Sequence, residues 1–250
     1  MKQAYLTVRS LIVWTVSLLH FGIVCTFLVL LGAFVDPRRN DRPQRLFFRN
    51  ILRLAGVKFE VRRSPGFNPG RTSIFICNHV NIFDPFVIYS AIPQFVRGFE
   101  LESHFKIPVY GWMMGRFGNV PVPDNPSRAG LEIMTQRSKA ALDSGISLIA
   151  FPEAGRTRDG HVAPFKKGIF NLAQKFAVPI VPMSIVGSYQ FFQTGHWMLY
   201  PGKITVCMHD TIDTSGIGKD EITDLVERVQ QIVSAPVEDS LQGCKSAGSN

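Results

Sequence analysis

The chain has 250 residues, of which 46% are hydrophobic and 18% are charged, and its formal net charge at pH 7 is +8. This length is enough for one substantial α/β domain with an appendage, and the composition is more apolar than that of the usual soluble enzyme. The cysteines are scattered without a C-x-x-C pair, which argues against a disulfide framework and against a zinc site. They are Cys25, Cys77, Cys207 and Cys244. The basic balance suits an anionic partner, either a nucleic acid, an anionic lipid or an anionic substrate.

The N-terminal stretch 11–35 is apolar and carries no charged residue until Asp36. At about 1.5 Å per residue, a helix of this length could cross a hydrocarbon core of about 30 Å. Lys2 and Arg9 precede it, as in a signal peptide, but the run is too long for such a peptide and no A-x-A site follows, so we expect no cleavage. His20 and Gly22 permit a break, so a hairpin that dips into one leaflet stays an alternative to a spanning helix.

A series of arginines follows the apolar run. They are Arg38, Arg39, Arg42, Arg45, Arg49 and Arg53. The last three recur every four residues on one face of a predicted helix, whose other face carries Phe47, Ile51 and Leu54. A basic amphipathic helix beside a membrane segment is typical of contact with anionic headgroups, although an ordinary surface helix would show the same pattern. We therefore expect residues 1–56 to anchor the chain at the cell inner (cytoplasmic) membrane, with the remainder facing the cytoplasm.

The rest of the chain alternates between strands and helices. We predict strands over 58–62, 73–77, 94–98, 119–122, 146–151, 179–186 and 203–208. We predict helices over 85–92, 127–142, 167–176 and 221–233, with short helices between 100 and 117. This order predicts an α/β fold with a largely parallel β-sheet flanked by helices. We place this domain at 57–236 and expect the polar stretch 237–250 to form a loose tail.

His79 and Asp84 lie between a predicted buried strand and a predicted helix. Open α/β sheets place their chemistry at such strand ends. Histidine is well suited to move a proton near neutral pH, and a carboxylate on one ring nitrogen leaves the other free as a base. The alternative is structural: Asp84 followed by Pro85 is a good helix N-cap, beside a half-buried histidine.

A second polar stretch, 151–160, follows another buried strand and should emerge at the same edge of the sheet. Arg156 and Arg158 beside a glycine-containing turn suit a bidentate grip on phosphate or carboxylate, and Lys166 and Lys167 add positive charge. A surface loop with a local ion pair between Glu153 and an arginine is the alternative.

Four stretches, in this order and spacing, resemble the glycerophospholipid acyltransferase family, whose bacterial members acylate lysophosphatidic acid. They are similar to the family's N-H-x-x-x-x-D-P, K…P…G, F-P-E-G-T-R and V-P-I-x-P blocks. In this chain the blocks lie at 78–85, 106–111, 151–156 and 178–182. The resemblance covers roughly 58–208, and the hydrophobic N-terminal segment also fits it.

The resemblance implies transfer of a fatty acyl group from acyl-CoA or acyl carrier protein to the free hydroxyl of a lysolipid, in the first place 1-acylglycerol-3-phosphate, which would give phosphatidic acid. His79 would remove the hydroxyl proton and Asp84 would orient His79. Backbone N–H groups at the helix start near Asp84 would stabilise the oxyanion. The partners would be the lipid bilayer, the lysolipid and the acyl donor, with no metal, no other cofactor and no nucleic acid.

The same resemblance implies the residues that bind the substrate. These are Asn78, Lys106, Arg128, Glu153, Gly155 and Arg156. Arg156 would hold the acceptor headgroup, with Glu153 ordering its loop and Lys106 or Arg128 as a second cation. Two positions depart from the family: Ala154 precedes Gly155 where the family has G-T, and Asp124 stands where the family has an arginine. An acceptor with another headgroup, such as an ornithine-type lysolipid, therefore stays an alternative.

Two other classes of function remain open. A lipid esterase or thioesterase would use water as acceptor, but the sequence has no G-x-S-x-G elbow. A non-catalytic lipid-binding protein would keep the basic helix without needing both His79 and Asp84. Nucleic-acid binding would suit the net charge, but the arginines cluster beside an apolar run, which favours lipid.

Overall fold

The structure is a computed structural model that describes residues 2–39 and 41–247. Within this part of the chain, seven strands form one sheet in the order β1-β7-β6-β2-β5-β3-β4. The strands are β1 (Val57–Arg63), β2 (Ile74–Cys77), β3 (Val96–Leu101), β4 (Val120–Val122), β5 (Ser147–Ala150), β6 (Ile180–Val186) and β7 (Gly202–Met208). All neighbouring pairs are parallel except β6 with β7. The predicted α/β fold with a largely parallel sheet is confirmed.

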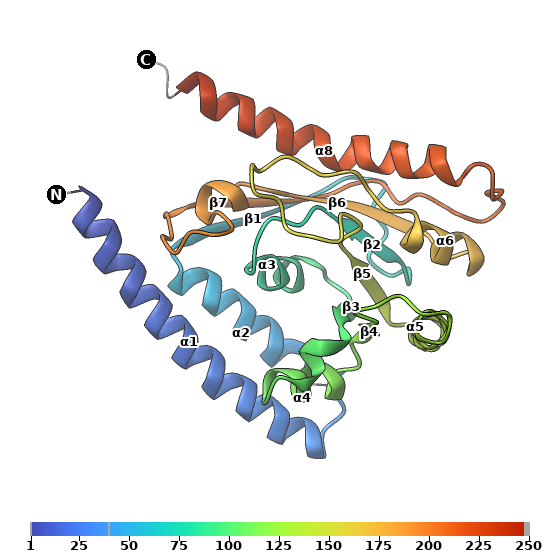
Figure 1. Ribbon diagram of the computed structural model, residues 1–250, viewed down its shortest axis with the longest axis horizontal. Coiled ribbons are helices and arrows are strands. Elements are labelled where there is room, and N and C mark those ends of the chain that lie inside the picture. Colours follow the sequence, from blue (N-terminus) through green and yellow to red (C-terminus); the bar gives the residue numbers. More distant parts are fainter. Residues whose placement is uncertain (1, 40, 248–250) are drawn as a thin grey trace.

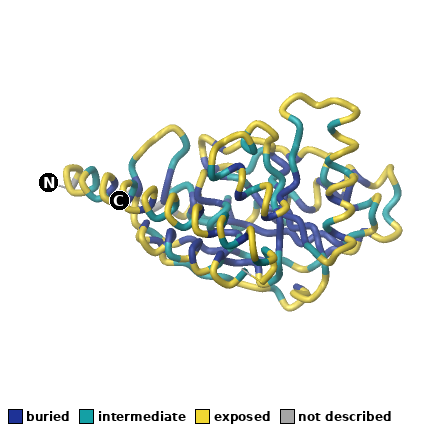
Figure 2. The backbone as a smooth tube through the Cα atoms, turned by 90° about the horizontal axis from the view of Figure 1, so that it is seen from below, coloured by how far each residue is buried: buried dark blue, intermediate teal, exposed yellow. Residues whose placement is uncertain are grey.

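Helices cover both faces of this sheet. They are α1 (Lys2–Phe34), α2 (Asp41–Leu54), α3 (Asp84–Ala91), α4 (Tyr110–Arg116), α5 (Arg128–Asp143), α6 (Gly168–Lys175), α7 (Ser188–Phe191) and α8 (Ile222–Ala247), with a 3-10 helix η1 (Glu102–Lys106) before α4. α8 covers one face, α3 and α2 cover the other, and α1 lies outside α2 (Figure 1). In Figure 2 the buried strands lie inside and the exposed positions follow the outer helices and loops.

The two central strands β2 and β5 are short, apolar and completely buried. Strands covered on both faces need apolar residues at every position, not at alternate ones. Phe75 packs into the core on the α2–α3 side, whereas its neighbours Ile74 and Ile76 pack on the α8 side. Ile76 pairs with Ala150 of β5 and with a residue of β6. The segments that follow β2 and β5 therefore leave the sheet side by side at its carboxyl edge.

α1 is one continuous helix, so the break considered at His20 and Gly22 does not occur. By length and composition it is able to cross a membrane, and only 22% of its apolar stretch is buried. Its buried face nevertheless contacts the domain near both ends. Arg9 donates to Leu199 O (2.7 Å) near one end, and the Arg116 side chain donates to Gly32 O near the other. α1 therefore lies along the domain and does not project from it.

α2 confirms most of the predicted amphipathic pattern. Phe47 and Ile51 are buried between α1 and the rest of the core, whereas Leu54 is exposed. Arg45, expected on the solvated basic face, is half-buried instead. It pairs with Asp41 and donates to the carbonyls that end α3, including Gln94 O (2.6 Å). Arginine beside a helix C-terminus satisfies its free carbonyls and opposes its dipole.

The last helix is longer than predicted. α8 continues through Pro236 and includes most of the stretch 237–250, which the sequence pattern assigns to a loose tail; residues 248–250 lie outside the described part. An apolar stripe that repeats every four residues explains the extension. Its buried members are Val229, Val233, Val237 and Leu241. His161 Nδ1 also lies 2.6 Å from Glu238 Oε2, and together these contacts outweigh the helix-breaking effect of the proline.

β3 begins and ends later than predicted. It starts at Val96 and continues to Leu101, because it pairs with β5 in its first half and with β4 in its second. Glu100, placed in a short helix by the sequence pattern, therefore belongs to the carboxyl end of a strand. This shift brings its carboxylate to the edge of the sheet that also carries the His79 loop.

Candidate active site

His79 and Asp84 are in direct contact in the loop between β2 and α3. His79 Nδ1 lies 2.9 Å from Asp84 Oδ2. The carboxylate is fully buried, whereas the imidazole keeps 21% of its side-chain surface exposed. Nε2 has no hydrogen-bond partner among the described residues. A buried acceptor on one nitrogen and a free second nitrogen are the geometry of an oriented general base.

The N-cap alternative for Asp84 is wrong. α3 begins at Asp84 itself, its N-cap is Phe83, and no side chain caps it. The carboxylate instead accepts from the backbone N–H groups of Val80 (2.5 Å) and Asn81 (2.8 Å) through the same oxygen that contacts His79. These bonds hold the carboxylate in place and close the loop into a compact turn.

Hydrogen bonds within the loop narrow the expectation for the oxyanion to the backbone N–H groups that these bonds leave free. The N–H groups of Val80 and Asn81 donate to Asp84, and that of Phe83 donates to Asn81 Oδ1 (2.9 Å). The N–H of Asp84 donates to Asn81 O (3.2 Å). The N–H groups of Val80, Asn81, Phe83 and Asp84 therefore maintain the loop and are not free to stabilise an oxyanion.

Ser188, at the start of α7, is a part of the site that the sequence does not reveal. Its hydroxyl donates to Asp84 Oδ1 at 2.9 Å across a separation of 104 residues. Asn81 Nδ2 donates in turn to Ser188 O and to Phe192 O. Ser188 and Asn81 are completely buried. Ser188 thus holds the Asp84 carboxylate, and Asn81 holds Ser188. No local motif in the sequence indicates that these residues meet.

The segment between β5 and α6, residues 151–167, forms the other wall of the site and is called the β5 loop below. The Phe151 ring stacks on the His79 ring, with centroids 4.0 Å apart and an interplanar angle of 16°. Glu153 Oε1 accepts from the N–H of His79 (2.5 Å), and Oε2 accepts from that of Ala163 (2.8 Å). Thr157 N donates to His79 O (3.0 Å). The β5 loop thus fixes the backbone of the histidine as well as its ring.

Glu153 therefore binds backbone groups on both of its oxygens. No ion pair joins it to an arginine in the part of the chain that the structure describes. Burial raises the pKa of Glu153 to about 6, and the N–H donors from Ala163 and His79 partly oppose that rise. The alternative of a local surface ion pair fails, because the carboxylate is buried and turned toward the loop interior.

The remaining substrate-binding candidates divide into one buried residue and an exposed set. The Asn78 amide accepts from Ile185 N (2.7 Å) and donates to Ile185 O (3.1 Å), so this side chain joins β2 to β6 and does not face a ligand. The exposed residues are Lys106 in η1, Arg128 at the start of α5, and Gly155 and Arg156 in the β5 loop. The described contacts bring none of these three cations into an ion pair.

Asp124, the residue that departs from the family pattern, is engaged with η1. It accepts from Ser103 N (2.8 Å) and from Ser103 Oγ (2.6 Å). These hydrogen bonds lower the pKa of Asp124, and the charges of His104 and Lys106 act in the same direction. The aspartate thus anchors η1.

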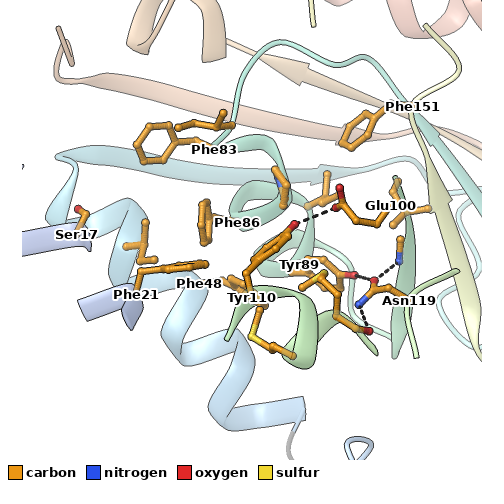
Figure 3. A pocket seen from close by; sticks show the side chains of 18 of the residues that line it. Ser17, Phe21, Phe48, Phe83, Phe86, Tyr89, Glu100, Tyr110, Asn119 and Phe151 are labelled. Atoms are coloured by element: carbon orange, nitrogen blue, oxygen red, sulfur yellow. Dashed lines mark hydrogen bonds between the residues drawn. The ribbon is translucent and has the colours of Figure 1, made fainter. Parts of the chain in front are cut away.

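A pocket of about 320 Å³ reaches Phe151, the ring that stacks on His79 (Figure 3). Aromatic and aliphatic side chains from α1, α2, α3 and α4 line most of it, and β3 and the end of β5 complete it. Phe151 belongs both to the pocket lining and to the stack on His79. Figure 3 places Phe151 and Glu100 at one end of the pocket, with Ser17 and Phe21 of α1 at the other. An extended apolar chain could therefore run from the histidine toward α1.

The polar groups of this pocket are largely paired with one another. Tyr110 OH donates to Glu100 Oε2 (2.9 Å), and His104 contacts the other oxygen. Tyr89 OH donates to Asn119 Oδ1 (3.1 Å). Burial and the nearby Glu100 raise the pKa of Tyr110, which keeps its phenol protonated. The pocket thus presents an apolar wall despite the polar atoms in it.

The segment between η1 and α4 shapes this wall with a strained turn. Val109 has φ 63° and ψ −57°, and Tyr110 N donates to Pro108 O (2.7 Å) across it. A side chain at Gly111 would lie 2.2 Å from Phe105 O. The K…P…G block therefore turns the chain tightly enough to direct Tyr110 into the pocket.

Among the described residues, no group of three or more His, Cys, Asp or Glu side chains is arranged to hold a metal ion. The site itself offers a histidine base, a buried carboxylate and an apolar pocket. Such a set can activate a hydroxyl toward an acyl group carried on a long hydrocarbon chain.

A family model described as Acyltransferase matches residues 58–186. The chain is 32% identical over 140 residues to the chloroplastic 1-acyl-sn-glycerol-3-phosphate acyltransferase BAT2 of Brassica napus, with 56% of the chain and 40% of the relative covered. It is 26% identical over 208 residues to a 1-acyl-sn-glycerol-3-phosphate acyltransferase of Haemophilus influenzae, with 81% and 86% covered. For the plant relatives from Brassica napus and Limnanthes alba, the chain spans 40% and 64% of their length.

The fold is similar to the crystal structure of the 1-acyl-sn-glycerophosphate (LPA) acyltransferase PlsC from Thermotoga maritima. The TM-score is 0.80 at 23% sequence identity, and the match covers 96% of this chain and 97% of the other. The match includes α1 and α2 as well as the sheet, since it covers nearly the whole chain.

Proposed function

Because the chain belongs to the acyltransferase family, we propose that it transfers a fatty acyl group from a thioester donor to the free hydroxyl of a lysolipid, with 1-acylglycerol-3-phosphate as acceptor and phosphatidic acid as product. The observation that carries this proposal is the contact of His79 with both Asp84 and Phe151. It joins an oriented base to an apolar pocket of about 320 Å³. The names of the relatives from Brassica napus and Haemophilus influenzae support the choice of acceptor.

In the proposed mechanism His79 acts as a general base. Nδ1–H donates to Asp84, so Nε2 carries the free lone pair and takes the proton of the lysolipid hydroxyl. The hydroxyl oxygen attacks the thioester carbonyl, a C–O bond forms and the C–S bond breaks. The proton on Nε2 then passes to the departing thiolate. Val80, Asn81 and Ser188 all donate to Asp84, so its carboxylate is held in place beside Nδ1.

The pocket accounts for the acyl group. With the carbonyl at His79, a fatty chain would continue past Phe151 between α3 and α4 toward α1 (Figure 3). Burial of each methylene contributes about 0.8 kcal/mol, so a long chain supplies much of the binding energy that positions the thioester. The donor is acyl-CoA or acyl carrier protein.

Ser188 bears on the esterase alternative. A serine hydrolase needs an accessible hydroxyl beside the histidine. Ser188 is completely buried and donates to Asp84 rather than to His79. The Ser188 hydroxyl therefore supports the His79–Asp84 pair. This favours a reaction in which the attacking hydroxyl belongs to a substrate.

The acceptor headgroup would lie near the exposed β5 loop. Arg156 and Arg158 offer guanidinium groups that match phosphate geometry. Lys106 or Arg128 would supply the second cation. A lysolipid with a different headgroup is the second candidate, favoured by Asp124, which stands where the family has an arginine.

We further propose that the chain is bound to the inner membrane from its cytoplasmic side, with α1 lying in one leaflet. The outward side of α1 exposes large apolar residues, including Leu11, Leu19, Ile23 and Phe27. Its other side is packed on the domain from Arg9 to Gly32. A helix bound along its length to a folded domain cannot cross the bilayer without taking that domain into the hydrocarbon, so an orientation parallel to the surface follows.

The test is acyl transfer by the purified full chain with isotopically labelled acyl-CoA or acyl carrier protein. The acceptors are lysophosphatidate, a zwitterionic lysophospholipid and a lyso-ornithine lipid, with products identified by mass. We expect labelled phosphatidic acid, and a higher KM for lysophosphatidate in Arg156→Ala than in the unmodified chain. Labelling of only the other acceptors would overturn the choice of acceptor, and labelling of none would overturn acyl transfer.

A further inference from the structure

A second hollow, of about 300 Å³, lies between α2 and the edge strand β1. Its lining consists of Arg49, Leu52 and Arg53 of α2 and of Val57 and Phe59 of β1. The two arginines are four residues apart, so they project to the same side of the helix. The hollow therefore combines two cationic groups with an apolar floor.

The charges of these arginines are not neutralised. Arg49 donates to Ser90 O at 3.3 Å, and Arg53 donates to Asn50 Oδ1 at 3.4 Å. Neither side chain forms an ion pair in the described part of the chain, and both are exposed. The acidic residue of β1, Glu60, is already paired with Arg62 and Lys203. Most of the guanidinium donors thus remain available to an anion.

Arg45, the third arginine on this face of α2, does not share the free N–H groups of Arg49 and Arg53. It belongs to the same four-residue series, but it is half-buried and bonded to Asp41, Tyr89 O and Gln94 O. The basic face predicted for α2 is therefore divided between one structural arginine and the two that line the hollow. A guanidinium with free N–H groups matches the geometry of a phosphate better than that of any neutral ligand.

The hollow lies on the same edge of the sheet as His79 but apart from it. Val57 pairs with Gly202 where β7 begins, and β7 runs antiparallel to β6. β1 therefore begins at the edge where β6 and β2 end. Three strand spacings separate β1 from β2, or about 14 Å. The end of α2 also touches α1, since Arg9 donates to Ala55 O at 2.9 Å, so the hollow is next to the proposed membrane surface.

We propose that this hollow binds the phosphate group of an anionic membrane phospholipid that is not the substrate. Arg49 and Arg53 would donate to the phosphate oxygens, and Leu52 and Phe59 would contact the glycerol and the first methylenes. The bound lipid would hold the catalytic edge of the sheet at the headgroup layer. The inference rests on the proposed membrane docking but not on acyl transfer.

The test measures binding of the full chain to vesicles of phosphatidylcholine, with and without phosphatidylglycerol. Arg49→Gln with Arg53→Gln removes both cations from the hollow. The control, Arg63→Gln with Lys175→Gln, removes the same charge from exposed positions on β1 and α6 that do not line it. We expect on the order of 30-fold weaker binding to the mixed vesicles for the hollow variant, from about fivefold per basic residue near the surface. The control should change much less.

A second measurement distinguishes a lipid from free phosphate. Calorimetric titration of the detergent-solubilised chain with dihexanoyl phosphatidylglycerol and with inorganic phosphate should show tighter binding of the lipid, lost in the hollow variant. If the hollow variant and the control variant lose vesicle binding equally, the binding reflects general surface charge, and the proposed site is overturned. Equal affinity for inorganic phosphate would overturn the lipid. Neither assay contains an acyl donor, so failure of the acyl-transfer proposal would leave both results interpretable.

Discussion

At the residue scale, His79 is the side chain on which the proposed reaction depends. Replacement by alanine leaves Asp84 bonded to Val80 N, Asn81 N and Ser188. We therefore expect His79→Ala to fold normally and to lose on the order of 10²–10⁴ in kcat. Steady-state kinetics with thermal unfolding as the control checks this prediction, and near-normal turnover by the folded variant would remove His79 from the chemistry.

Ser188 acts through Asp84 and provides a separate prediction. Loss of a hydrogen bond to a buried carboxylate costs about 1.5–3 kcal/mol in unfolding free energy. We expect Ser188→Ala to show that loss, a smaller fall in kcat than His79→Ala, and an altered pH profile of kcat. Ser188→Thr keeps the hydroxyl and should restore the profile. An unchanged profile in Ser188→Ala would limit the residue to a structural role.

Glu153 makes stability depend on pH in a direction set by its raised pKa. The folded carboxyl titrates at about 6 and the ordinary value is 4.5, so between these values the unfolded chain ionises first and is favoured. The free energy of unfolding should fall by about 2 kcal/mol as pH rises from 4.5 to 6, and should then level off. Glu153→Gln should lack this step. Identical pH dependence of denaturant unfolding in both proteins would contradict the raised pKa.

At the scale of elements, α1 carries the proposal of how the protein meets a bilayer. Trp112 and Trp197 are exposed and lie on segments bonded to opposite halves of α1: α4 through the Arg116–Gly32 contact, and the loop after α7 through Trp14 and Trp197 O (2.6 Å). If α1 lies flat in one leaflet, both segments lie at that leaflet. Single-tryptophan variants in vesicles with brominated lipid only in the outer leaflet should therefore both be quenched. Quenching of one and not the other would indicate a spanning helix.

The elements also show how far the sequence determines the fold. The buried strands β2 and β5 were predictable because both are apolar runs bounded by polar turns. The length of α8 was not, since Pro236 ends a helix on local grounds and only burial of Val237 and Leu241 against the domain reverses that. The role of Arg45 was missed for the same reason, because the carbonyls it binds come from α3.

Part of the candidate site was predictable from the sequence, and part was not. His79 and Asp84 are close in sequence, so their contact was predictable from spacing and from the strand that precedes them. Ser188 and the Phe151 stack arise from distant segments brought together by the order of β2, β5 and β6, which no local pattern specifies. The sequence likewise could not separate Asn78, which joins two strands, from the exposed Arg156.

At the scale of the whole molecule, the apolar helix α1, an apolar pocket and His79 form one continuous arrangement. α1 supplies part of the pocket wall, the pocket reaches Phe151, and Phe151 stacks on His79. If α1 lies in the bilayer as proposed, an acyl chain and a lysolipid would reach His79 from the bilayer without crossing bulk water. The two-helix N-terminal segment is part of the active structure and not a detachable anchor, since Phe47 and Ile51 of α2 share the core with α3.

The most direct test of this account is the fate of an acyl label supplied as a thioester to the purified chain in lipid vesicles, with and without lysophosphatidate. The account predicts that the label moves into the diacyl phospholipid, that this requires the lysolipid, and that His79→Ala stops it while the chain stays folded. Release of the label as free fatty acid at the same rate in both conditions would contradict it, because water would then be the acceptor.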